Sequence, residues 1–74
     1  MKELDCLGDV CPIPLVKLKK ELPAIRAGET VSIVTDHSCS GREVMDYCAR
    51  MGLLCQEEEP LTGIWRYQIQ QPEP

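Results

Sequence analysis

The pattern of apolar and polar residues along the chain predicts four β-strands. The strongest signal is Thr30–Asp36, which reads Thr-Val-Ser-Ile-Val-Thr-Asp and is rich in β-branched residues. In Ile64–Gln70 the residues alternate, which places Trp65, Tyr67 and Ile69 on one face of the strand. The two remaining strands are predicted at Lys2–Leu7 and Leu53–Glu59.

The segment between the first two strands has the periodicity of an amphipathic helix. From Pro12 to about Arg26, apolar residues recur at helical spacing, at Leu15, Leu18, Leu22 and Ile25. Pro23 interrupts the pattern, because proline has no N–H to offer to the helical hydrogen bonds. The helix is therefore predicted to bend at its last turn or to end just before Pro23.

A second helix is predicted between the second and third strands. Ser40 and Glu43 have the spacing of a capping box, which predicts where this helix begins. Val44 and Cys48 lie on its inner, apolar stripe. Gly52 suits the left-handed position that follows the last turn of many helices, so the helix is expected to end just before it.

The order of these elements is β-α-β-α-β-β, which predicts an α/β fold. The first β-α-β unit is expected to be a right-handed crossover between parallel strands, and the last two strands a hairpin. With both helices on one face of a four-stranded mixed sheet, the result is a two-layer sandwich. Residues 1–70 are expected to form a single domain, and residues 71–74 a loose C-terminal tail.

Composition narrows the classes of function. The 74 residues carry a net charge of −4 without a basic stripe, which argues against direct nucleic acid binding. No apolar run approaches the ~18 residues of a membrane span, and no signal-peptide pattern opens the chain, so membrane insertion and secretion are not expected. We therefore expect a cytoplasmic protein, in which five cysteines would not form a full disulfide framework.

Cys11 is the candidate catalytic residue. It is followed by Pro12, Ile13 and Pro14, and proline is tolerated in the first turn of a helix, where its missing N–H would have no partner. Cys11 is thus placed at or just before a helix N-terminus, where backbone N–H groups and the helix dipole favour a thiolate. Asp9 acts in the opposite sense, because a nearby carboxylate disfavours a thiolate. We interpret Cys11 as a nucleophile or a sulfur carrier, with both prolines shaping its helix entrance.

The topology brings further candidates to the same place. Cys11 follows the first strand and His37 and Cys39 follow the second, and the carboxyl ends of parallel strands share one edge, where α/β proteins commonly build sites. Cys39 and His37 are therefore candidates for an auxiliary role. Cys6 is a third candidate, as a resolving thiol, although packing in the core is the simpler interpretation. The two remaining cysteines, Cys48 and Cys55, are interpreted as structural.

A structural zinc site is the alternative function. Cys6, Cys11, His37 and Cys39 offer four nitrogen and sulfur ligands, the number that a tetrahedral zinc site uses. The spacing between Cys6 and Cys11 is at the permissive limit, however, and the second pair does not have the spacing of a standard zinc knuckle. The sequence also lacks a Cys-x-x-Cys redox motif. We therefore rank thiol chemistry above metal binding and expect no resident metal.

The stretch from Leu4 to Pro14 resembles the signature of the TusA family of sulfur carriers, which includes SirA-like and YedF-like proteins. The family pattern is Leu-Asp-x-x-Gly-x-x-Cys-Pro-x-Pro, and every fixed position is matched here. The resemblance extends over essentially the whole chain. Supporting matches are Gly28–Glu29, Asp36 and Trp65–Ile69.

This resemblance implies a sulfurtransferase in which Cys11 carries sulfur as a persulfide, a covalent intermediate that needs no cofactor. It implies sulfur-donor and sulfur-acceptor proteins as partners, in tRNA thiolation, molybdenum cofactor synthesis, thiosulfate utilisation or selenium metabolism. Some members of the family work beside a membrane thiosulfate transporter. Cys6 and Cys39 are not part of the family pattern, so the resemblance leaves open whether a second thiol resolves the persulfide.

Overall fold

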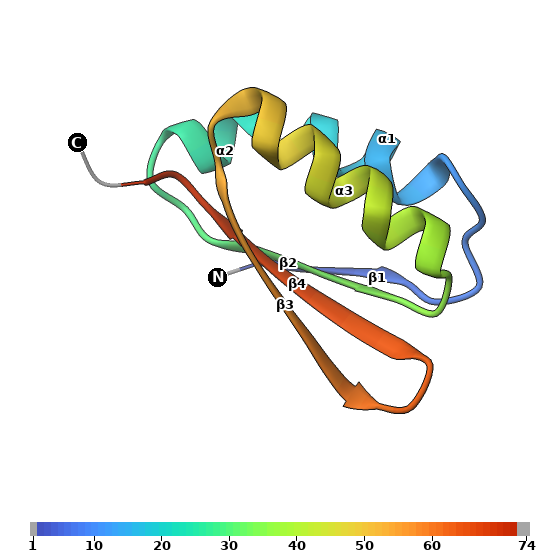
Figure 1. Ribbon diagram of the computed structural model, residues 1–74. Coiled ribbons are helices and arrows are strands. Elements are labelled where there is room, and N and C mark those ends of the chain that lie inside the picture. Colours follow the sequence, from blue (N-terminus) through green and yellow to red (C-terminus); the bar gives the residue numbers. More distant parts are fainter. Residues whose placement is uncertain (1, 73–74) are drawn as a thin grey trace.

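A four-stranded sheet with all helices on one face makes up residues 2–72, the part of the chain that the computed structural model describes (Figure 1). The strands are β1 (Lys2–Cys6), β2 (Val31–Thr35), β3 (Leu54–Leu61) and β4 (Ile64–Gln70). The helices are α1 (Ile13–Lys20), α2 (Leu22–Arg26) and α3 (Ser38–Met51). The predicted α/β sandwich with a mixed sheet is therefore confirmed.

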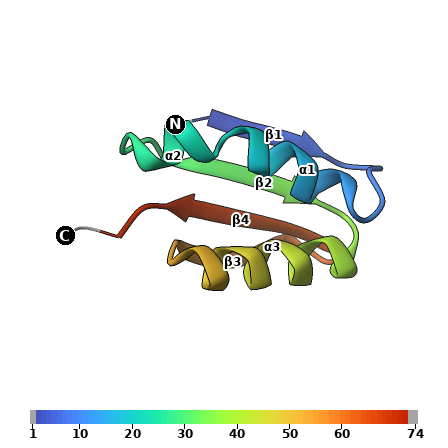
Figure 2. The same ribbon diagram turned by 90° about the horizontal axis from the view of Figure 1, so that it is seen from above.

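The strands lie in the order β1-β2-β4-β3 across the sheet, so β4 lies between β2 and its own hairpin partner β3. β1 and β2 pair in parallel, with Leu4 opposite Ile33, while β4 is antiparallel to both of its neighbours. Because β1 and β2 are parallel, their carboxyl ends share one edge of the sheet. The connections that lead into α1 and α3 both leave from that edge (Figure 2).

The core between the sheet and the helices is mainly aliphatic. Its fully buried members include Leu18 of α1, Val44 of α3 and Ile33 of β2. Burying one such side chain contributes roughly 1.5–3 kcal/mol relative to leaving it exposed, so this layer of contacts holds the helices on the sheet. The face predicted for β4 is also the inner one, since Tyr67 and Ile69 are buried there.

The first predicted helix is two helices in the structure, so residues 2–72 contain three helices and the prediction of two is wrong. α1 ends at Lys20 and α2 begins at Leu22. Glu21 lies between them and is the C-cap of α1 and the N-cap of α2. Pro23 is the physical reason. Its ring clashes with the preceding turn and it has no N–H to donate, so it is accommodated in the first turn of a new helix.

The capping box predicted at Ser40 and Glu43 is also wrong. The N-cap of α3 lies three residues earlier, at His37, which has an extended conformation, φ −118° and ψ 120°, and makes no side-chain cap hydrogen bond. Ser40 lies inside the first turn and is buried. The end of the helix is as predicted, because Gly52 takes the left-handed conformation with φ 70°.

The β3–β4 hairpin extends beyond the layer of helices (Figure 1). β3 runs on to Leu61, two residues past its predicted end, and its ladder with β4 is irregular between Glu58 and Leu61. β3 is an edge strand and most of it is exposed. Its Glu-Glu-Glu-Pro run from Glu57 protects this edge, because charge and proline discourage pairing with another strand.

The C-terminal tail is predicted to be loose from residue 71 onward. The Gln71 side-chain oxygen accepts a hydrogen bond of 2.9 Å from the Arg26 guanidinium, which ties this residue to α2. Glu73 and Pro74 lie outside the described residues. Within residues 2–72, no helix is both long and apolar enough to cross a membrane.

Candidate functional site

The candidate site lies at the edge of the sheet where β1 and β2 end (Figure 2). The connection after β1 carries Cys11 to the start of α1, where Pro12 is the N-cap and Pro14 occupies the first turn. The connection after β2 leads directly into α3, which carries Cys39 in its first turn. Cys11 therefore precedes a helix opened by prolines, as the sequence predicted.

The structure joins Cys11 and Cys39 in a disulfide. Their Cα atoms are 6.5 Å apart, although 28 residues separate them in the sequence. Cys11 is half-buried and Cys39 is exposed. The expectation that Cys39 lies beside Cys11 is thus confirmed, and the two sulfur atoms form the centre of the site.

Ser40 completes the immediate surroundings of Cys11. Its hydroxyl oxygen lies 3.4 Å from Cys11 Sγ, and its side chain is only 2% exposed. A disulfide sulfur or a thiolate has no proton to give, so in either state the hydroxyl is the donor. The local sequence suggested only a helix cap at Ser40. Ser40 precedes Val44 by four residues and Cys48 by eight, and this helical spacing is the signal that places Ser40 on the inner face of the helix.

Asp9 does not act on the site as an unpaired carboxylate. Its Oδ2 accepts a charge-assisted hydrogen bond from Lys17 Nζ, and the same ammonium lies 3.4 Å from the Asp5 carbonyl oxygen. Asp9 raises the pKa of Lys17, chiefly through this hydrogen bond. The negative charge of Asp9, which was expected to disfavour a thiolate at Cys11, is therefore balanced by the Lys17 ammonium.

Asp36 connects the two loops of the site. One of its carboxylate oxygens accepts the backbone N–H of Gly8 at 3.0 Å and also lies 2.8 Å from His37 Nδ1. Gly8 has φ +82°, a backbone conformation that residues other than glycine rarely adopt. The hydrogen bond from Gly8, and to a lesser extent the contact with His37, lowers the pKa of Asp36. His37 thus directs its ring toward Asp36, and its auxiliary role at the site stays a prediction.

Asp36→Asn is expected to lower the melting temperature at neutral pH. The lowered pKa means that the carboxylate stabilises the folded state above its unfolded-state pKa of ~3.9, and that this contribution is lost as the pH falls through the folded-state value. The difference in melting temperature between wild type and variant should therefore shrink on acidification, as followed by circular dichroism. Asp46→Asn, at an exposed position on α3, is the control. A difference that is independent of pH would contradict this assignment.

The other candidate thiols lie in the core. Cys6 is fully buried at the end of β1, and burial raises the pKa of its thiol. Cys48 is 1% exposed and Cys55 is half-buried against the core, as expected for structural residues. Within residues 2–72, no three His, Cys, Asp or Glu side chains converge as ligands for a metal ion. The alternative zinc site of Cys6, Cys11, His37 and Cys39 is therefore not formed.

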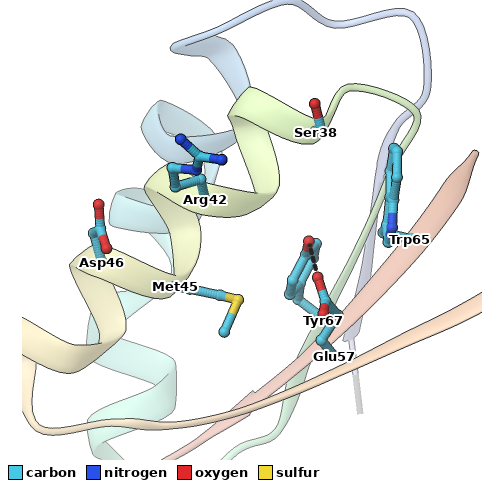
Figure 3. Close-up of a pocket in the computed structure, with 7 residues that line it drawn as sticks. All are labelled: Ser38, Arg42, Met45, Asp46, Glu57, Trp65 and Tyr67. Atoms are coloured by element: carbon cyan, nitrogen blue, oxygen red, sulfur yellow. Dashed lines mark hydrogen bonds between the residues drawn. The ribbon is translucent and has the colours of Figure 1, made fainter.

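A pocket of about 350 Å³ opens between α3 and the β3–β4 hairpin (Figure 3). Ser38, at the start of α3, is one of its lining residues. The remaining lining residues are Arg42, Met45, Asp46, Glu57, Trp65 and Tyr67. The Tyr67 hydroxyl donates a hydrogen bond of 2.7 Å to Glu57 across the hairpin. The sequence did not predict this pocket, because it depends on how far the hairpin projects past the helix.

Comparison with known proteins assigns the family. The family model described as sulfurtransferase TusA matches residues 2–71. A protein of Methanocaldococcus jannaschii, named as a candidate sulfur carrier protein, is 34% identical over 62 residues, which cover 80% of this chain and 83% of that protein. The crystal structure of a SirA-like protein from Desulfitobacterium hafniense superposes with a TM-score of 0.88 at 31% identity, covering 99% of this chain and 100% of that one. The chain belongs to the TusA family.

Proposed function

We propose that this protein is a sulfur carrier in which the Cys11 thiolate accepts sulfane sulfur and passes it on. The observation that carries the proposal is the position of Cys11, half-buried in front of α1 and beside the Ser40 hydroxyl. Two of the other thiols, Cys6 and Cys48, are buried and cannot meet a protein donor. Membership of the TusA family and the name of the M. jannaschii relative support the same role.

The transfer needs two nucleophilic steps and no cofactor. The Cys11 thiolate attacks the outer sulfur of a donor persulfide, so that a persulfide forms on Cys11 and the donor cysteine leaves as a thiolate. An acceptor thiolate then attacks the outer sulfur on Cys11, which regenerates the Cys11 thiolate. Each step exchanges one S–S bond for another, and the protein acts as a sulfurtransferase through its covalent intermediate.

Ser40 is expected to support this thiolate. A hydrogen bond to a charged group contributes about 1.5–3 kcal/mol, so Ser40→Ala should slow alkylation of Cys11 by iodoacetamide by roughly tenfold at neutral pH. The rate is measured in the reduced protein by mass spectrometry of the Cys11 peptide. Ser38→Ala removes an exposed hydroxyl from the same helical turn and should leave the rate unchanged. Equal rates for the two variants would show that Ser40 does not stabilise the thiolate.

The partners that fit this chemistry are proteins with reactive thiols or persulfides. The pocket lies between the hairpin and α3, the helix that carries Cys39, and its exposed Met45 and half-buried Trp65 provide apolar contact area for such a partner. We extend the proposal to a cytoplasmic setting, because a reducing compartment keeps Cys11 free to react. tRNA thiolation, cofactor synthesis and thiosulfate utilisation with a membrane transporter are the pathways in which a carrier of this family would act.

The proposal is tested by loading the reduced protein with sulfur. After removal of the reductant, the protein is incubated with a persulfide donor or thiosulfate, and its intact mass is measured. We expect an increase equal to one sulfur atom, which peptide mapping assigns to Cys11. Sulfur found in equal amounts on Cys6, Cys48 or Cys55, or on no cysteine of the loaded Cys39→Ser variant, in which Cys11 has no neighbouring thiol, would refute the proposed carrier role.

A further inference from the structure

Cys39 is a second thiol at the site that sulfur carriage by Cys11 does not require. The distance of 6.5 Å between the Cα atoms of the pair falls within the 4.4–6.8 Å that disulfides usually span, so the backbone already holds them in bonding geometry. Cys11 lies in the connection after β1 and Cys39 in the first turn of α3, and Asp36, which precedes α3, ties the two segments together by accepting the N–H of Gly8. The fold therefore presents Cys39 Sγ to the sulfur atom that would carry the persulfide.

We propose that Cys39 resolves the Cys11 persulfide and releases its outer sulfur as sulfide. This inference rests on the proposed carrier function. The Cys39 thiolate attacks Cys11 Sγ, the bond between Cys11 Sγ and the outer sulfur breaks, and the outer sulfur leaves with the electron pair as HS⁻. The sulfane sulfur gains two electrons, and the two cysteines lose them in forming the Cys11–Cys39 disulfide. A dithiol reductant of the thioredoxin class then supplies two electrons and two protons to restore both thiols.

The point of attack decides between release and transfer. An acceptor thiol that approaches from solvent meets the outer sulfur of the persulfide and takes it away. Cys39 Sγ, in contrast, is bonded to Cys11 Sγ in the structure. Cys11 Sγ is the inner sulfur when Cys11 carries a persulfide. Attack there displaces the outer sulfur as a small leaving group, and no acceptor protein is needed.

Cys39 is also the cysteine best placed to be the attacking thiolate. It occupies the second position of α3, a helix of 14 residues, and the N-terminal turn of a helix favours a thiolate. Its side chain is exposed, so a proton can pass to water and HS⁻ can leave. Cys6 and Cys48 are buried, and the pKa of each thiol is raised, by burial at Cys6 and by the contact with Cys55 together with burial at Cys48.

The test compares wild type with Cys39→Ser. Both proteins are reduced, loaded with sulfane sulfur from a persulfide donor, freed of donor and reductant, and checked for sulfur on Cys11 by peptide mapping. Sulfide release is then followed with a sulfide electrode, and disulfide formation by mass spectrometry. Wild type should release one sulfide for each loaded Cys11 while the Cys11–Cys39 disulfide forms. Cys39→Ser should release sulfide at least about tenfold more slowly, because the intramolecular thiol is lost.

Further measurements separate this intramolecular step from a reaction between two molecules and from misfolding of the variant. The release rate of wild type should not depend on protein concentration, as an intramolecular reaction requires. Loaded Cys39→Ser should still give its sulfur to added glutathione, and its circular dichroism spectrum and melting curve should match those of reduced wild type, which a misfolded variant would not show. Cys55→Ser should release sulfide like wild type. Equal release from wild type and Cys39→Ser, or loaded wild type that keeps its persulfide, would overturn the inference while leaving the carrier function intact. Failure of Cys11 to load in Cys39→Ser, which lacks the resolving thiol, would overturn both.

Discussion

Cys11→Ser is expected to abolish sulfur loading. Serine keeps the size and the hydrogen-bonding capacity of the side chain, but its hydroxyl does not ionise at neutral pH and cannot form a stable persulfide analogue. Loading should fall by roughly 10³-fold or more, the scale of loss that follows removal of an enzymatic nucleophile. The measurement is the sulfur content of the intact protein after incubation with a persulfide donor. Because Cys11 is half-buried in a connection outside the core, the variant should fold like wild type.

Two controls make the Cys11→Ser result specific. Cys55→Ser removes a half-buried thiol from β3 and should leave loading unchanged. Cys39→Ser should still take up one sulfur atom, because the carrier step uses Cys11 alone. Undiminished loading of Cys11→Ser would mean that another thiol carries the sulfur, with exposed Cys39 as the first to examine.

Gly41→Ala is expected to lower the stability of the folded protein. Gly41 lies in α3 directly over Tyr67 of β4, and a Cβ there would come within 2.6 Å of Tyr67 Cζ and still closer to the hydroxyl oxygen. Overpacking of this kind costs about 1–3 kcal/mol, which outweighs the gain of about 1 kcal/mol that alanine has over glycine within a helix. Urea denaturation followed by circular dichroism should therefore show a lower midpoint.

A double-mutant cycle tests the cause of the Gly41→Ala effect. Tyr67→Phe removes the oxygen nearest to the new methyl group, so Gly41→Ala should cost less in that background. The Tyr67 hydroxyl also donates to Glu57, but Glu57 is exposed and water can replace this donor. Costs that add within about 0.3–0.5 kcal/mol would mean that the two residues do not clash. A displaced α3 would also carry Cys39 away from Cys11, so sulfide release should fall together with stability.

The local pattern of apolar and polar residues was sufficient to predict most of the helices and strands. β2 and β4 were predicted from β-branched composition and from alternation, because the backbone of a strand imposes a period of two. The same reasoning placed Tyr67, Ile69, Val44 and Cys48 on inner faces. It failed where two local preferences compete. Pro23 was recognised as an interruption, but the sequence does not show that the chain restarts as α2 instead of bending.

The position of Cys11 in front of a helix and its likeness to the TusA signature were determined by the sequence alone. Proline fixes the backbone at any helix start, whatever packs around it. The order β1-β2-β4-β3, the burial of Ser40 next to Cys11, and the pairing of Cys11 with Cys39 were decided only by the tertiary structure. Each of these depends on contacts between residues far apart in the chain. The periodicity of apolar residues within one segment does not indicate which strand or helix lies beside it. The sequence therefore identified the candidate sulfur-carrying thiol, and the packing of α3 on the sheet placed the second thiol beside it.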